Sequence, residues 1–161
     1  MDFKATQATK TYIQLNEATP DRIFPLLCPV READWLDGWE YEMIYSKSGL
    51  VEENCVFATP HHGKEKTLWH VTKHDPQQYE VSFVRFTPHE NVVKIDIRLI
   101  DNHDGTTAAH IAYQYTALSK AQNDFIENEL ENSFHASMQW WEKAINHYLA
   151  TGEMLKKHKS D

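Results

Sequence analysis

The sequence predicts an α+β protein in which a seven-stranded antiparallel sheet curves around one long C-terminal helix. Three observations support this class: an apolar stripe of helical period near the C-terminus, strand-like segments joined by short turns through the middle, and two short helices after the first strand. A sheet with one face in water must bury its other face, and the apolar stripe of the helix offers a cover of suitable length.

The C-terminal helix is predicted over residues 119–149. Its apolar residues recur at steps of three or four, which is the spacing of one face of an α-helix. This stripe consists of Ile126, Leu130, Phe134, Met138, Trp141, Ile145 and Tyr148. Ser119 suits the N-cap, Gln122 completes a capping box, and Gly152 suits the residue that ends the helix. One continuous helix of about 30 residues would be about 45 Å long.

The N-terminal part of the chain predicts one strand and two short helices. Residues 5–16 are rich in threonine and β-branched side chains, which favours a strand. Thr19 and Pro20 then suit the start of a short helix that reaches residue 27. A second short helix is predicted over residues 30–35 and is closed by Gly38.

Six further strands follow at near-regular intervals, which predicts an antiparallel meander within one domain spanning residues 1–161. Turn residues separate them, most clearly Asp75-Pro76 and the run from Asn102 to Gly105. These strands are predicted over residues 39–45, 51–59, 66–72, 79–86, 92–100 and 106–117.

Composition narrows the class of function. The net charge of -8 argues against nonspecific nucleic-acid binding, which needs clustered basic residues, and the small cluster 156–159 is expected to be a solvated chain end. Residues 1–10 do not resemble a signal peptide, and no apolar run approaches the roughly 18 residues of a membrane span. Cys28 and Cys55 are expected to be buried free thiols, so we expect a cytoplasmic protein.

Alternation along the strands predicts which side chains face the helix. Trp39, Tyr41 and Met43 should point inward because Glu40 and Glu42 between them need water. The same rule, applied to every strand and to the helix stripe, gives the candidate cavity residues Trp39, Tyr41, Met43, Glu53, Cys55, Phe57, Trp69, Phe83, Arg85, Tyr113, Tyr115, Phe134, Met138 and Trp141.

Glu53 and Arg85 are the charged members of this set, and a buried charge needs a partner or a functional reason. One interpretation is that Arg85 binds an anionic group of a ligand, with Glu53, Tyr113 or Tyr115 orienting it. The other is that Glu53 and Arg85 lie at strand ends, where they meet water or pair with each other. Aromatic residues at this spacing also have two interpretations, as packed core or as the wall of a cavity.

Motifs for metal or cofactor chemistry are not apparent. The ten histidines, including His61-His62, do not follow a known ligand spacing, and the five glycines do not form a phosphate or dinucleotide loop. We therefore expect neither a metal nor a cofactor.

Several stretches resemble the START/Bet v 1-like superfamily, also called SRPBCC, and in particular an uncharacterised bacterial branch of it. They are residues 24–32 with Trp35, Gly38 and Trp39, then 49–57, Trp69, 115–119 and 147–152. The resemblance implies the helix-grip fold, with a ligand cavity between sheet and helix. It also implies that Arg31 and Glu32 border the mouth of the cavity, where they close the entrance, contact a ligand or form an exposed ion pair.

Three functions are compatible with this resemblance. The first is binding of a small hydrophobic or amphipathic molecule in the cavity. The second is an enzyme like the polyketide cyclases and aromatases of the superfamily, with Glu53, Arg85, Tyr113 and Tyr115 as catalytic candidates. The third is a protein-interaction module similar to its co-chaperone domains, which needs an exposed apolar patch instead of a cavity. The oligomeric state stays open, with a homodimer among the alternatives.

Overall fold

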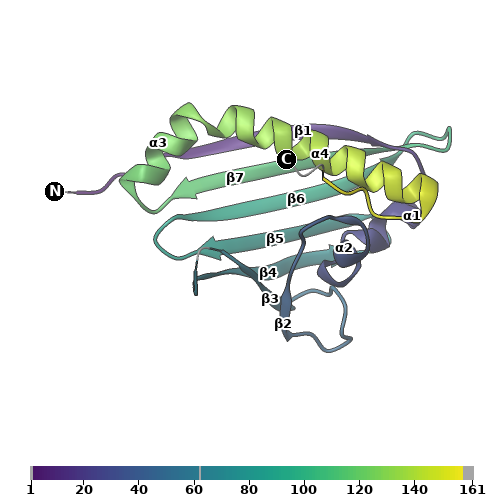
Figure 1. Cartoon of the computed structure of the whole chain (residues 1–161), viewed down its shortest axis with the longest axis horizontal. Helices are drawn as coiled ribbons and strands as arrows, with labels where there is room; N and C mark the ends of the chain where they lie inside the picture. The colour runs from purple at the N-terminus through teal and green to yellow at the C-terminus, as the bar shows by residue number, and fades with distance from the viewer. Residues whose placement is uncertain (1, 62, 158–161) are drawn as a thin grey trace.

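A computed structural model describes residues 2–61 and 63–157; predictions that concern Met1, His62 and the end of the basic cluster, 158–161, lie outside these ranges. The strands form one antiparallel sheet in the order β1-β7-β6-β5-β4-β3-β2 (Figure 1). Their bounds are β1 Gln7–Asn16, β2 Glu42–Tyr45, β3 Val56–Pro60, β4 Lys66–Asp75, β5 Glu80–Thr87, β6 Asn91–Asp101 and β7 Thr107–Ala117. The helices are α1 Pro20–Ile23, the 3-10 turn η1 Phe24–Leu26, α2 Pro29–Trp35, α3 Lys120–Asn128 and α4 Leu130–Thr151. The predicted α+β class and the seven-stranded sheet are confirmed.

Strict alternation gives the sheet a buried inner face and a wet outer face. In β6, for example, the core residues are Val93, Ile95, Ile97 and Leu99, and the charged residues between them are exposed. Burial of such side chains stabilises the fold by about 1.5–3 kcal/mol each. The inner face therefore carries most of the stability of the sheet and defines the side on which α4 must lie.

The helix α4 is attached to β1, an edge strand of the sheet, and lies along it in Figure 1. The backbone N–H of Leu15 donates to Glu142 Oε2 at 2.6 Å, and the Leu15 carbonyl accepts from Asn146 Nδ2 at 2.9 Å. Asn146 Oδ1 also accepts from the Glu17 N–H at 2.9 Å. These side chains pair the backbone groups that an edge strand would otherwise leave open.

The helix α2 closes the other end of the inner face. Trp35 is completely buried, and its Nε1 donates to the Leu26 carbonyl at 3.0 Å. Its ring packs on Trp141 of α4 with 5.5 Å between ring centroids. The helix α4 lies toward β1, and α2 contacts α4 from the opposite side. The two helices therefore do not cover the whole inner face of the middle strands.

The predicted single C-terminal helix is wrong in one respect, because Glu129 interrupts it with a non-helical backbone (φ -124°, ψ -25°). The apolar stripe continues across the break, since Ile126 of α3 and Leu130 of α4 are both buried. Periodicity therefore could not reveal it. Ser119 Oγ accepts from the Gln122 N–H at 3.2 Å, which confirms the N-cap, and Gly152 ends α4 with φ 72°.

The reciprocal half of the predicted capping box is wrong. The side-chain oxygen of Gln122 accepts a hydrogen bond from Asn91 Nδ2 at 3.0 Å instead of returning to the backbone of Ser119. This bond ties the start of α3 to the start of β6.

Asn146 provides a test of the attachment of α4 to β1. Asn146→Ala should lower the free energy of unfolding by about 0.5–1.5 kcal/mol, because the Leu15 carbonyl of β1 and the Glu17 N–H just after it lose an exposed partner. Lys143→Ala, at an exposed position of the same helix, is the matched control and should change it by less than about 0.5 kcal/mol. Urea denaturation of the three proteins measures both effects, and equal midpoints would contradict this account of the edge.

Candidate functional site

A cavity of about 780 Å³ lies between the inner face of the sheet, α2 and α4. This volume is within the range of about 300–1,000 Å³ that is usual for small-molecule sites. Its walls include ten predicted residues, namely Trp39, Phe57, Trp69, Phe83, Arg85, Tyr113, Tyr115, Phe134, Met138 and Trp141. The same walls include further residues that alternation had not selected for the site, chiefly Pro29, Glu32, Leu36, Asp37, Ser133, Ser137, Trp140 and Lys157.

One side of the cavity is a wall of four rings, Trp39, Phe57, Trp69 and Phe83, which we call the aromatic wall. Phe57 and Trp69 are stacked with their centroids 5.3 Å apart. Trp39 and Phe83 meet the Trp69 ring edge-on at 6.2 and 6.0 Å. Such contacts hold the rings in fixed orientations, so the wall presents a rigid apolar surface.

Arg85, on β5, places its guanidinium group among aromatic rings inside the cavity. Its Cζ lies 5.5 Å from the Trp69 ring centroid, 5.7 Å from that of Tyr113 and 5.6 Å from that of Tyr115. Its Nη2 donates to the Tyr115 hydroxyl at 2.8 Å, while its buried Nε has no acceptor. No carboxylate of the described residues pairs with it. The cation is thus held by rings and lacks a counter-charge.

Glu32, on α2, is the acidic group of the cavity. It is only 8% exposed, and burial raises the pKa of its carboxyl group to about 8. Within residues 2–61 and 63–157 its side chain makes no hydrogen bond or ion pair. Its neighbour Arg31 bonds to Asp34 at 2.9 Å, so the predicted Arg31–Glu32 ion pair is wrong. Glu32 is therefore a neutral acid at pH 7 that faces the cavity.

The chain that follows α4 borders the mouth of the cavity. The backbone N–H of Lys157 donates to Asp37 Oδ2 at 2.9 Å, and Lys156 Nζ lies 3.6 Å from Asp37 Oδ1. The Lys157 ammonium group stacks on the Trp140 ring, 5.3 Å from its centroid. Lys156 and Lys157 are exposed, as predicted for a solvated end, and they also contact Asp37 and Trp140.

Four predicted cavity residues lie elsewhere. Cys55 is completely buried in the core, and Tyr41 and Met43 are half-buried against it without lining the cavity. Glu53 is exposed in a turn before β3, where Asn54 has φ 73°. The predicted strand over residues 51–59 begins only at Val56, so alternation does not apply to Glu53 and its predicted inward direction is wrong.

Trp140 is a functional candidate that sequence reasoning missed, whereas Glu32 was placed at the mouth of the cavity by the resemblance alone and not by alternation. Trp140 lies beside the apolar stripe of α4 and not on it, and its buried Nε1 has no acceptor in the described part of the chain. A glutamate on a seven-residue helix usually faces water, so only the resemblance to a known family drew attention to this stretch. The available signal was the spacing of Glu32 from Trp35 and Leu36, since residues three and four apart share one helix face.

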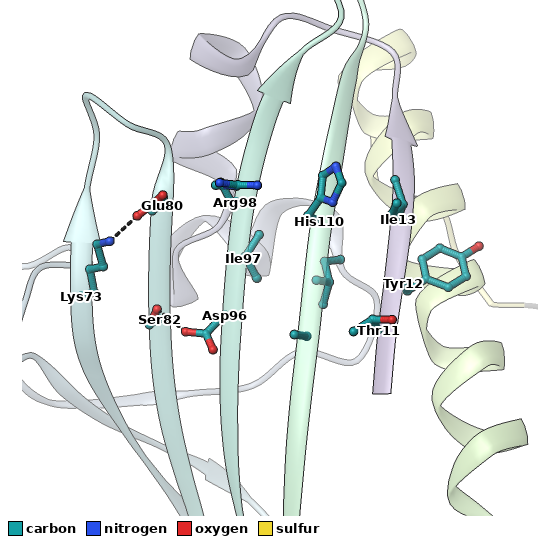
Figure 2. Close-up of a pocket in the computed structure, with 12 residues that line it drawn as sticks. Thr11, Tyr12, Ile13, Lys73, Glu80, Ser82, Asp96, Ile97, Arg98 and His110 are labelled. Carbon is teal, nitrogen blue, oxygen red and sulfur yellow. Dashed lines mark hydrogen bonds and ion pairs between the residues drawn. The ribbon is translucent and has the colours of Figure 1, made fainter. Parts of the chain in front are cut away.

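A second hollow, of about 580 Å³, lies on the outer face of the sheet (Figure 2). Four of its charged and polar groups already have partners, since Lys73 pairs with Glu80 and Ser82 Oγ donates to Asp96 at 2.6 Å. This hollow therefore resembles an ordinary wet sheet surface, whereas the inner cavity holds charged and polar groups without partners.

Residues 2–61 and 63–157 contain no cluster of three or more side chains that could ligate a metal ion. The helices within these ranges lack the length and apolar character that a membrane span needs.

Comparisons with known proteins identify the fold. No family model and no curated protein sequence matches the chain. The structure of Ara h 8.0201 aligns with a TM-score of 0.66 at 16% identity, over 91% of this chain and 99% of that one. The structure of norcoclaurine synthase from Thalictrum flavum, with dopamine and hydroxybenzaldehyde bound, aligns with a TM-score of 0.66 at 13% identity, over 98% of this chain and 91% of that one. The Zhui aromatase/cyclase from Streptomyces sp. R1128 aligns with a TM-score of 0.64 at 9% identity, over 94% of this chain and 100% of that one.

These alignments cover almost the whole chain and confirm the expected resemblance at the level of the fold, which is the helix-grip fold of Bet v 1-like proteins. At these identities they show the fold alone, because one fold supports many functions.

Glu32 should make stability depend on pH. Its folded pKa of about 8 lies above the ordinary 4.5, so the folded state binds more protons between these values and stability falls as pH rises through this window. From pH 5 to pH 8 the loss should be about 3 kcal/mol. Chemical denaturation of the wild type and Glu32→Gln at both pH values tests this. Burial lowers the pKa of His74, which acts in the opposite direction but equally in both proteins. The same pH dependence in both proteins would contradict the assignment.

Proposed function

We propose that this protein binds a small hydrophobic or amphipathic molecule that carries an anionic group, in the cavity between the sheet and α4. The single observation that carries the proposal is the Arg85 guanidinium group. It is a cation inside an aromatic cavity, with an unpaired Nε and no carboxylate partner among the described residues. A half-buried cation without a counter-charge has lost part of its hydration, and a bound anion would compensate that loss.

The rest of the cavity suits the apolar part of such a molecule. The aromatic wall and Phe134 offer flat apolar surfaces, and small-molecule sites typically combine such surfaces with a few polar anchors. Norcoclaurine synthase, which is similar in fold, has been solved with two small aromatic molecules, dopamine and hydroxybenzaldehyde. The interaction-module hypothesis required a filled interior, and a cavity of about 780 Å³ does not favour it.

Catalysis is a second candidate function, and Glu32 is the observation that favours it. A buried acid with a pKa of about 8 can give and take a proton near neutral pH, which is what general acid–base catalysis needs. Glu53, the acid proposed from sequence, is exposed outside the cavity and does not suit this role. Conversion of a molecule that co-purifies with the protein, and its loss in Glu32→Ala, would support an enzyme; unchanged recovery of that molecule would support carriage alone.

The first measurement is native mass spectrometry of freshly purified protein, followed by extraction and identification of any bound molecule. A stoichiometric anionic aromatic or aliphatic molecule would support the proposal. Empty protein that also fails to bind the probes below would contradict it.

Arg85→Ala should weaken binding of 2-naphthoate at least tenfold, because the carboxylate loses its cation; this corresponds to about 1.4 kcal/mol. Isothermal titration calorimetry measures the affinities. The neutral analogue 2-naphthalenemethanol should bind the wild type and Arg85→Ala within about threefold of each other. Arg98→Ala, which removes an exposed arginine from the outer face of β6, is the matched control and should leave both affinities unchanged. Equal naphthoate affinity in wild type and Arg85→Ala would remove Arg85 from the site.

A further inference from the structure

The cavity contains a second polar group without a partner, and its chemistry narrows the class of ligand. We propose that Glu32 is a second anchor of the cavity, whose carboxylic acid donates a hydrogen bond to an acceptor oxygen of the ligand other than the anionic group bound by Arg85. The ligand class is then an aromatic acid with a second acceptor, such as a carbonyl oxygen. This inference rests on the proposed function.

The geometry around Glu32 supports a role toward a ligand. The residue lines the cavity and is 8% exposed, yet its carboxyl group makes no bond within the described residues. The fully occluded polar atoms without a partner do not include its carboxyl oxygens, so these oxygens are open to the cavity, where a bound molecule can accept a hydrogen bond from the acid.

The cavity as a whole has an excess of hydrogen-bond donors. The Nε of Arg85 and the Nε1 of Trp140 are buried without an acceptor, and protonated Glu32 adds an O–H. The indole groups of Trp39 and Trp69 are already satisfied, by the Pro29 carbonyl at 2.9 Å and by Thr59 Oγ1 at 3.0 Å. Arg85 Nε and Trp140 Nε1 are occluded, so the donors that a ligand can reach are the rest of the Arg85 guanidinium group and the O–H of Glu32. A ligand that complements these two groups supplies acceptors at two points, which a hydrocarbon or a simple amine does not.

The groups that face Glu32 leave its carboxyl group protonated and neutral. From β7 it meets Tyr113, whose own pKa burial raises, so the phenol stays neutral. On its own helix Arg31 is held by Asp34.

The remaining charged groups of the cavity also have other partners. Asp37 is held by Lys156 and Lys157, and Lys157 lies over Trp140. On β5, Arg85 bonds to Tyr115. Among the described residues no cation therefore stabilises a Glu32 carboxylate, and burial alone raises its pKa to about 8.

Two matched probes test the inference, 6-acetyl-2-naphthoate and 6-isopropyl-2-naphthoate, which share ring and carboxylate and differ in the second acceptor. At pH 7 the wild type should bind the acetyl probe at least fivefold more tightly. Glu32→Gln, which keeps a donor and nearly the same shape, should retain this preference, and Glu32→Ala should lose it. Melting temperatures of both variants check that they fold.

Raising the pH supplies an independent readout. Both probes stay anionic from pH 7 to pH 9, while Glu32 loses its proton; its donor is then gone and its charge repels the ligand. The affinity of the wild type for the acetyl probe should fall about tenfold from pH 7 to pH 9, since Glu32 is still protonated in about one protein molecule in ten at pH 9. Glu32→Gln should show less than a threefold change.

The outcomes separate this inference from the proposed function. Arg85-dependent binding that is indifferent to pH and to Glu32→Ala would overturn the role of Glu32 and leave the proposed function standing. The same fall with pH in Glu32→Gln would also overturn it, because another group would then be titrating. If neither probe binds the wild type, both proposals fail together.

Discussion

The way α4 is attached to the sheet controls the rest of the structure. Its Glu142 and Asn146 side chains bond to the backbone of β1, so the helix is fixed along one edge and not across the middle of the sheet. Two consequences follow. Leu15, near the end of the edge strand, gains partners for both of its backbone groups, and the inner face of β4–β6 is left for α2 and for a cavity. A helix packed centrally by apolar contacts alone would have filled this space.

The sequence predicted the sheet well because its signals are local and repeated. In β6 the charged residues Lys94, Asp96 and Arg98 alternate with buried ones, so the strand has only one orientation that avoids burying charge. The stripe of α4 and the α-helical ends at Ser119 and Gly152 were equally clear. The same rule found most of the cavity wall, including Arg85, since a cavity in this fold is lined by the inner face of the sheet.

What the sequence could not predict depends on departures from regular backbone and on distant neighbours. Glu53 sits where a turn replaces the expected strand, so alternation gave it the wrong direction. Glu32 looked like a surface residue because a helix of seven residues has too few turns to show a buried face. Its burial comes from the sheet and α4, which lie far from it in the sequence. Asp37 likewise pairs with residues far from it in the sequence, near the C-terminus.

The concentration of indole rings has a practical consequence for any study of this protein. Of the five tryptophans, Trp39, Trp69, Trp140 and Trp141 line the cavity, and the fifth, Trp35, packs on one of them. The intrinsic emission of the protein therefore arises almost wholly from the surroundings of one site. An aromatic molecule that enters the cavity would change the polarity around these indoles and quench them by contact, so occupancy can be followed optically without any added label.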